Sequence, residues 1–268
     1  MKRHESKAIK EAIVKEIVEE IRQNNPEMGL RKIHTRLNPK GIGRDEFIRI
    51  GMNNGLGISP MRCFHKTTYS DGSRYFPNLT GDLVINDINQ VWCSDITYFR
   101  VKDVFYYITL VQDVYDRSIV GWHVHEDLKT IANCIALQKA FKTRNCSDFG
   151  GKLIHHSDRG CQYTSYQYTG MLKEAGIRIS TCNSVYENAF VERLNGIIKN
   201  EYLRQMNITG LSELKKALDK AVESYNNERP HMKLNYMTPV EYAEYISSIS
   251  LDERPSFKMY KEPRIFVN

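Results

Sequence analysis

The chain has 268 residues, 41% of them hydrophobic and 26% charged, as is ordinary for a globular protein with a sizeable core. No run of about eighteen apolar residues occurs, which excludes a membrane-spanning helix, and the N-terminus lacks a signal-peptide core. The six cysteines include no CxxC pair, so we expect reduced thiols in a cytoplasm and neither a disulfide frame nor a zinc site.

The positive charge is unevenly distributed along the chain. The formal net charge is +6, and all of this excess lies in residues 1–66, while the rest of the chain is balanced. A basic segment favours contact with a polyanion such as DNA, although a solvated helical surface would carry the same charge.

Three short helices are predicted in the basic segment. Residues 7–23, 29–37 and roughly 44–54 carry apolar residues at helical spacing, and Gly55 follows as a C-terminal stop. Together they predict a helix-turn-helix-like DNA-binding domain over residues 1–59.

Apolar stripes give each of these helices an inner and an outer face. The first helix places four isoleucines on its inner face: Ile9, Ile13, Ile17 and Ile21. The second helix turns three apolar residues inward, namely Leu30, Ile33 and Leu37. Its outward residues are basic and are candidates for contact with DNA: Arg31, Lys32 and Arg36.

The pattern changes after a linker. Residues 60–88 are polar and aperiodic, which indicates a linker. From residue 91, three β-branched and aromatic runs separated by turn-length gaps predict antiparallel strands. Further elements follow in the order helix, strand, helix, strand, helix, at residues 130–142, 152–157, 165–175, 177–181 and 188–203. This order predicts an α/β fold with a mixed five-stranded sheet and helices on its faces, over residues 89–250, with a tail at 251–268.

Two aspartates stand on predicted strands. Asp95 lies within the apolar run VWCSDITYF, where a buried carboxylate must be paired, hydrogen-bonded or bound to a metal. Asp158 ends the strand at 152–157 in HHSDRGCQYTS and is followed by Arg159 and Gly160. A turn would explain this position, and so would an acid presented at the sheet edge, with Gly160 letting the backbone turn away.

The helix at 188–203 carries a third carboxylate, Glu192. At about 100° per residue, one side of this helix holds the apolar Phe190, Leu194 and Ile197 for burial against the sheet. The other side holds out a polar stripe of Asn188, Glu192, Asn195 and Lys199. Such a stripe suits a metal ligand beside a phosphate-binding edge, and a solvated helix face would look similar.

Two other glutamates are rivals for the same role. Glu187 and Glu201 each point more than about 100° away from Glu192, so only one of the three can share this face. With Asp95 and Asp158, such a glutamate forms a hard oxygen site suited to Mg²⁺ or Mn²⁺. Two such ions activate the attacking oxygen and stabilise the leaving oxygen of a phosphoryl displacement, so no side-chain nucleophile is needed.

Five motifs, in order, resemble the second-frame (OrfB) transposases of bacterial insertion sequences. WCSDITYF, HHSDRGCQYTS and ENAFVERLNGIIKNEYL resemble the segments that carry that family's Asp-Asp-Glu triad. GLRKIHTRLNPKGIGRDEFIRIGMNNGLG resembles the family's helix-turn-helix-like domain, and YNNERPHMKLNYMTPVEY resembles its C-terminal signature. The resemblance covers roughly residues 29–242.

The resemblance implies a retroviral-integrase-like core with a ribonuclease-H-like fold. It implies that Asp95, Asp158 and Glu192 are the catalytic, metal-binding triad, with two Mg²⁺ or Mn²⁺ ions. It also implies cleavage at the 3′ ends of a DNA element followed by strand transfer, in a bacterial cytoplasm. Side chains on the helix edge would contact DNA: Asn188, Asn195 and Lys199. The implied partners are DNA, further copies of the chain in a homo-oligomer and a first-frame (OrfA) protein, but no membrane.

Two alternatives keep parts of this prediction. A ribonuclease-H-like nuclease would hydrolyse DNA without joining it, but it does not need the basic N-terminal helices. A DNA-binding protein with an inactive core would need none of the three acids, all of which are present.

Several other polar residues receive structural predictions. Asp113 and Asp116 are expected to be turn residues, and His155 and His156 to be packed on their strand. Trp92 and Trp122 are expected in the core. The Arg229-Pro230-His231 motif is expected to form a structural corner.

Overall fold

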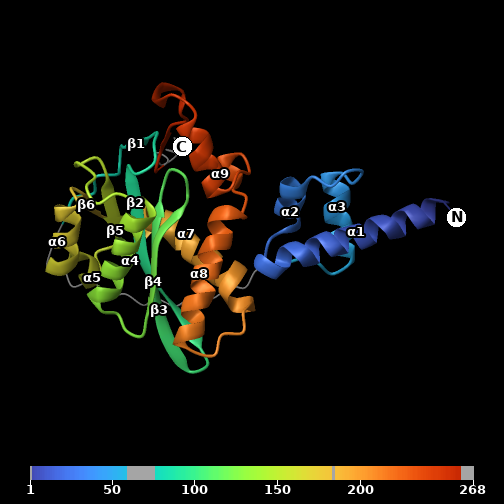
Figure 1. Ribbon diagram of the computed structural model, residues 1–268, viewed down its shortest axis with the longest axis horizontal. Coiled ribbons are helices and arrows are strands. Elements are labelled where there is room, and N and C mark those ends of the chain that lie inside the picture. The colour runs from blue at the N-terminus through green and yellow to red at the C-terminus, as the bar shows by residue number, and fades with distance from the viewer. Residues whose placement is uncertain (1, 59–75, 183–184, 261–268) are drawn as a thin grey trace, which may run out of the picture.

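A computed structural model describes residues 2–58, 76–182 and 185–260 of the chain. Its centre is a five-stranded mixed sheet in the order β4-β3-β2-β5-β6 (Figure 1). Strands β2, β3 and β4 pair antiparallel with their neighbours. β5 pairs in parallel with β2, and β6 pairs in parallel with β5, as strands joined by helical crossovers do. The strands are β2 (Val91–Val101), β3 (Val104–Asp113), β4 (Ile119–His125), β5 (Ile154–Ser157) and β6 (Arg178–Thr181). The predicted mixed sheet is confirmed.

Helices cover both faces of the sheet. One face packs against a first group of helices, α4 (Thr130–Thr143), α5 (Cys161–Thr164) and α6 (Tyr166–Glu174). The other face packs against α7 (Ala189–Ile197) and α8 (Leu211–Asn227). Alternate residues of β2 serve the two sides: Trp92 is buried toward α4, and Cys93 is buried toward α7.

The predicted helix at 188–203 is not one regular α-helix. A 3₁₀ turn, η1 (Val185–Asn188), precedes α7, and a π-helical segment, η2 (Ile198–Tyr202), continues it before a last turn, η3 (Leu203–Gln205). The π-helical segment changes the angular step per residue beyond Ile197, although Lys199 still faces β2 as predicted.

The residues after α8 are folded onto the core as well. A short turn, η4 (Met232–Leu234), leads to α9 (Pro239–Ser247), which begins with a capping box between Thr238 and Glu241. Another turn, η5 (Leu251–Glu253), leads to β7 (Phe257–Lys258), which pairs antiparallel with β1 (Val84–Ile85). The expected tail at 251–268 therefore contains a strand, as far as it lies within the described residues.

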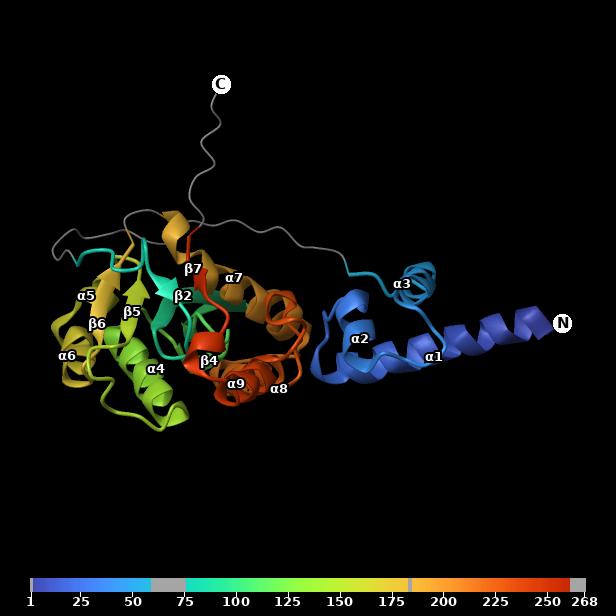
Figure 2. The same ribbon diagram turned by 90° about the horizontal axis from the view of Figure 1, so that it is seen from above.

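The N-terminal segment forms the three predicted helices. They are α1 (Lys2–Asn24), α2 (Leu30–Leu37) and α3 (Arg44–Asn53), and they share a small apolar core that includes Val18, Ile33 and Phe47. The predicted inner faces are partly wrong, because Ile9, Ile13 and Leu37 are exposed. The N-terminal end of α1 extends beyond α2 and α3 (Figures 1 and 2). Ile9 and Ile13 flank Lys10, which pairs with Glu46 of α3, and their side chains stay exposed among the described residues.

This bundle lies against the C-terminal side of the core (Figure 1). The main-chain N–H of Glu27 donates to the carbonyl oxygen of Glu201 at 3.1 Å, and the Tyr202 hydroxyl donates to Asn25 Oδ1 at 3.0 Å. Ion pairs from α2 add to these contacts, joining Lys32 to Glu201 and Arg36 to Glu241. The first half of the predicted linker, residues 60–75, lies outside the described residues, and the second half runs along β6, where the Leu79 N–H donates to Ser180 Oγ at 2.9 Å.

Candidate active site

Strand register brings the two aspartates together. Ser94 of β2 pairs with Ser157 of β5, and in each strand the next residue is an aspartate, Asp95 and Asp158. Because the two strands are parallel, both carboxylates leave the sheet at the same level. Asp158 is thus an acid at a strand end, as the functional explanation expected.

Gly160 has a different role from the one predicted. Its φ of −57° is open to any residue, so the turn does not require glycine. A Cβ at this position would lie 3.0 Å from Asp158 Oδ1 and 3.1 Å from Gln162 Oε1. The Gly160 N–H donates to the same Asp158 oxygen at 3.0 Å. Glycine is favoured because a side chain here would crowd the Asp158 carboxylate.

Three of the four residues of the polar stripe contact the sheet, and only Glu192 is held out into solvent. Asn195 donates from Nδ2 to Asp95 Oδ2 at 2.8 Å, and Lys199 donates from Nζ to Thr97 Oγ1 at 2.7 Å. Asn188 is buried and donates to the Ser94 carbonyl oxygen at 3.4 Å. The solvated alternative is therefore wrong for the two asparagines. Against prediction, Phe190 and Ile197 are only partly buried, and Val191 and Ile198 take their places in the core.

Glu192 lies beside this pair of aspartates but is exposed. Asp95 and Asp158 line one pocket, and Glu192 is not among the residues that line it. Within the described ranges, no three acidic, histidine or cysteine side chains are arranged to hold a metal ion. The structure therefore brings the two aspartates together and leaves Glu192 at their margin.

The electrostatics of the three carboxylates are those of a site short of positive charge. Burial, followed by repulsion from Asp158, raises the pKa of Asp95 to about 8. Burial also raises the pKa of Asp158, and burial together with Asp158 raises the pKa of Glu192. Two amide oxygens, Asn188 Oδ1 and Asn195 Oδ1, are buried next to β2 without a partner among the described residues. Hard oxygen donors that repel one another fit a divalent cation.

The rival glutamates have other partners. Glu201 accepts two hydrogen bonds from Arg229, at 2.7 Å from Nε and 2.9 Å from Nη2, and a third from Lys32. These cations keep the pKa of Glu201 below its usual range even though burial acts in the opposite direction. Glu187 accepts from Asn78 Nδ2 at 2.8 Å. Neither glutamate lines the pocket.

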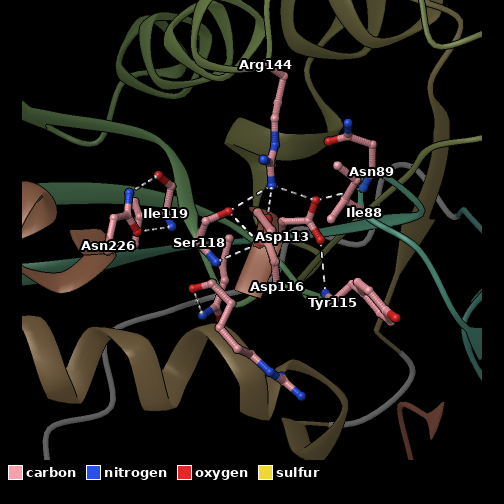
Figure 3. Close-up of polar contacts among 12 residues, drawn as sticks. Ile88, Asn89, Asp113, Tyr115, Asp116, Ser118, Ile119, Arg144 and Asn226 are labelled. Carbon is pink, nitrogen blue, oxygen red and sulfur yellow. Dashed lines mark hydrogen bonds and ion pairs between the residues drawn. The ribbon is translucent and has the colours of Figure 1, made fainter. Parts of the chain in front are cut away.

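Asp113 and Asp116 form a structural ion cluster (Figure 3). Both side chains are fully buried, and Arg144, just after α4, reaches them with Nη2 at 3.0 and 2.7 Å. Asp116 also caps the turn by accepting from the Ser118 N–H at 2.8 Å. Trp92 is the partner of Asp113 across the sheet, which places the cluster several residues from Asp95 along β2. The structural prediction is confirmed, and the cluster ties the β3–β4 turn to α4.

The strand histidines are packed as expected. His155 Nε2 lies 2.8 Å from the Tyr168 hydroxyl, and His156 Nδ1 lies 2.8 Å from Ser180 Oγ. Burial lowers their pKa values to about 3 and about 4, so both are neutral near pH 7. Trp92 is in the core, whereas Trp122 is only partly buried, with Lys139 Nζ 3.6 Å from its ring centroid.

The basic residues of α2 differ in their surroundings. Arg31 is exposed, whereas Lys32 and Arg36 are paired with Glu201 and Glu241 of the core. The Arg229-Pro230-His231 corner lies at this junction, since buried Arg229 holds Glu201 and lies 3.3 Å from His231. The expected structural corner is present.

Sequence reasoning missed the pocket walls. They include Tyr98 and Tyr107 from two adjacent strands, Leu128 before α4, and Gln162 and Tyr163 on α5. Gln162 donates to the Leu128 carbonyl oxygen at 2.9 Å. The position of Gln162 and Tyr163 soon after Asp158 was a usable signal, but Leu128 could be placed only by the fold.

Comparisons with known proteins agree with this architecture. The integrase core domain family matches residues 86–186, and a second integrase core domain family matches residues 175–239. The chain is similar to a simian T-cell lymphotropic virus intasome solved in complex with a PP2A regulatory subunit, with a TM-score of 0.50 and 17% identity over 88% of this chain and 77% of that one. At this identity, the likeness concerns the fold.

Curated relatives carry the functional assignment. The transposase of insertion sequence element IS629 from Shigella sonnei is 31% identical over 89% of this chain and 81% of its own length. The transposase of element IS904 from Lactococcus lactis is 30% identical over 67% of this chain and 76% of its own length. Such similarity over most of both chains, together with the integrase core, shows a polynucleotidyl transferase of DNA transposition. The chain therefore belongs to the insertion-sequence transposases with an Asp-Asp-Glu integrase core.

Proposed function

We propose that Asp95, Asp158 and Glu192 are the catalytic carboxylates of this transposase and that they would hold two Mg²⁺ or Mn²⁺ ions. The reaction is cleavage of DNA at the 3′ ends of the element, followed by joining of these ends to a target. The register that sets Asp95 beside Asp158 carries this proposal. When bound, the ions activate the attacking oxygen and stabilise the leaving oxygen of the phosphoryl displacement.

The protein side chains have separate tasks in this proposal. Asp95 and Asp158 are fixed by the sheet, and Asn195 keeps the Asp95 carboxylate oriented through its 2.8 Å hydrogen bond. Glu192 is the third acid, and in the described structure it is exposed and outside the pocket lining. Burial, followed by repulsion from Asp158, raises the pKa of Glu192, and positive charge at the site would draw it in.

The domain assignment and the DNA contacts belong to the same proposal. Residues 1–59 bind DNA through α2, residues 60–88 link that domain to the core at 89–250, and Lys199 places a cation beside Thr97 for a phosphate. Arg31 is available in the described structure, while Lys32 and Arg36 have to exchange a core carboxylate for phosphate. Asn188 and Asn195 act through β2, because each donates its amide N–H to that strand. Their unpartnered oxygens are acceptors and cannot bind DNA phosphates, which are acceptors too.

The partners in this proposal are DNA, further copies of the chain and a first-frame protein that recognises the element ends. Residue exposure supports one part of it: Ile9 is 60% exposed and Ile13 38% exposed, one helical turn apart on α1, in a stripe of the kind that pairs with another helix. None of the described helices is long and apolar enough to cross a membrane.

The test compares three proteins on one substrate. A duplex that ends in the element's own terminal repeat is incubated with Mn²⁺ and with wild type, Glu192→Gln or Glu187→Gln, with and without the first-frame protein. We expect wild type and Glu187→Gln to cleave and join, and Glu192→Gln to lose at least about 10³-fold in rate, as removal of an electrostatic catalytic group does. An inactive Glu187→Gln would move the third acid to Glu187.

Two outcomes favour the alternatives. Cleavage without joined product, at any metal concentration, would identify a nuclease. Binding without cleavage, even with both the metal and the partner, would identify a DNA-binding protein with an inactive core.

A further inference from the structure

The residues after α9 reach back to the active-site side of the core. We name residues 251–260 the C-terminal strap. The strap is anchored by the pairing of β7 with β1, by the hydrogen bond from the Tyr115 hydroxyl to the Pro255 carbonyl oxygen at 2.9 Å, and by an ion pair between Arg254 and Asp87. It ends next to the start of α7, and Figure 2 shows β7 beside that helix.

The hydroxyl of Tyr260 contacts both segments that carry the later two acids. It donates to the Glu187 carbonyl oxygen at 2.7 Å, in the turn that starts α7 and leads to Glu192. It also lies 3.3 Å from Nε2 of His156, on the strand that ends in Asp158. One hydroxyl therefore spans the gap between β5 and the N-terminus of α7.

The proton assignment in this cluster is self-consistent. The Leu79 N–H donates to Ser180 Oγ, so the Ser180 hydroxyl is free to donate to His156 Nδ1 at 2.8 Å. The His156 ring then carries its proton on Nε2, which lies 3.3 Å from the Tyr260 oxygen and 3.2 Å from Cys182 Sγ, and Tyr260 directs its own proton to Glu187. Thr80 Oγ1 lies 3.1 Å from the same hydroxyl. The hydroxyl is thus held by three segments of the core.

A second contact ties the strap to α7 independently. The guanidinium of Arg117 lies between two phenylalanine rings, 4.4 Å from the centroid of Phe190 on α7 and 5.2 Å from that of Phe257 on β7. The Phe257 ring also stacks on Tyr115, with an angle of 4° between the planes. A cation held between two aromatic faces resists sliding of one element past the other.

We infer that Tyr260 is a positioning residue of the transposase, whose hydroxyl fixes the distance between the Asp158 strand and the Glu192 helix. The inference rests on the proposed triad. Because the metal-binding groups come from separate elements, a loosened spacing weakens metal binding before it affects DNA binding. Groups that orient metal ligands typically change metal affinity by about 10- to 100-fold when they are removed.

The test uses the full-length protein and Mn²⁺ alone as the probe. Tyr260→Phe removes the hydroxyl and keeps the ring, and Tyr245→Phe, at an exposed tyrosine of α9, is the matched control. Free Mn²⁺ is measured by electron paramagnetic resonance during titration, together with DNA affinity, melting temperature and the joining rate at several Mn²⁺ concentrations.

We expect Tyr260→Phe to bind Mn²⁺ about 10-fold more weakly, at the low end for such positioning groups. Its joining rate should fall at low Mn²⁺ and recover at high Mn²⁺, while DNA affinity and the control variant stay within about twofold of wild type. A Mn²⁺ affinity within that twofold range overturns the inference, even if the variant is less stable.

Two further results are distinguishable. If Tyr260→Phe does not fold, Thr80→Val takes its place, and it must weaken Mn²⁺ binding in the same direction, or the inference is wrong. If the wild type itself binds no Mn²⁺ with or without DNA, the proposed metal site has failed, and the positioning role of Tyr260 fails with it. A wild type that binds Mn²⁺ and a Tyr260→Phe variant that binds it equally well leave the proposed function intact and remove only the inference.

Discussion

At the scale of single residues, the carboxylate of Asp95, which we propose as a metal ligand, is unfavourable for folding when it is charged. Its folded-state pKa of about 8 lies far above that of a free aspartate, near ~3.9, because burial and Asp158 disfavour the charge. A raised folded pKa means that the unfavourable charge is absent below about pH 4, grows as pH rises, and is complete above about pH 8. Without a cation, Asp95 therefore destabilises the fold at neutral and higher pH.

Asp95→Asn should accordingly stabilise the metal-free protein. At pH 8 in a chelator we expect its melting temperature to rise by about 2–4 °C, which corresponds to about 1 kcal/mol in a domain of this size. The gain should vanish near pH 4, and Asp252→Asn, at an exposed position, should show neither effect. Mg²⁺ should raise the melting temperature of wild type only. A variant that melts below wild type at pH 8 would contradict this explanation.

The sequence supports some residue predictions and not others. Asp95 and Asp158 could be predicted because each interrupts or ends an apolar strand, and parallel pairing then sets them level. The direction of the α7 stripe could not be predicted. A helical wheel gives angles relative to Glu192 but does not say which side of the helix faces the sheet. Asn195 points inward because its amide donates a hydrogen bond to Asp95, a residue a hundred positions away in the sequence.

At the scale of elements, the π-helical segment η2 is stabilised by a distant arginine. Glu201 of η2 binds Arg229, whose side chain is 6% exposed, and also Lys32 of α2. The strands were predictable because their β-branched runs end at turn residues. No local pattern marks the π-helical segment, because the residue that holds it comes after α8.

Glu201→Gln should destabilise the protein by about 3 kcal/mol in urea unfolding at pH 7, because it leaves the Arg229 charge buried without its counterion. The folded pKa of Glu201 is depressed, so its contribution is complete above the unfolded value of about 4.3 and is lost as pH falls below it. The difference between wild type and variant should therefore shrink toward pH 3. In the double variant Glu201→Gln/Arg229→Met, part of the loss should be recovered. If the losses of stability in Glu201→Gln and in Arg229→Met simply add up in the double variant, the two residues do not interact.

At the scale of the whole molecule, the N-terminal bundle and the core are joined by ion pairs. Arg36 and Lys32, which we propose for DNA binding, are neutralised by Glu241 and Glu201 in the described structure. Phosphate has to compete with these carboxylates. The overall α/β architecture could be predicted from periodicity, but this contact could not, because charged surface residues carry no sequence signal for their partners.

Glu241→Gln should tighten nonspecific DNA binding by releasing Arg36. The substitution keeps the capping box of α9, in which glutamine can replace glutamate, so the core should stay folded. We expect a gain of about fivefold in affinity for a random duplex at low salt, and a salt dependence steeper by about one counterion. Glu244→Gln on the same helix is the control. An unchanged salt slope would show that Arg36 remains bound to the core or never reaches the phosphates.

The central place of β2 in the sheet also orders the events of folding. β2, β3 and β4 form a meander of local contacts, which closes quickly, whereas β5 joins β2 only after α4 has crossed the sheet. Asp95 is thus placed by local pairing and Asp158 by a long-range pairing, while the strap reaches the start of α7 last, through the Tyr260 hydroxyl. If the proposed triad and the inferred role of Tyr260 hold, a chain that has not yet emerged from the ribosome as far as Tyr260 should carry all three carboxylates without the contact that sets their spacing.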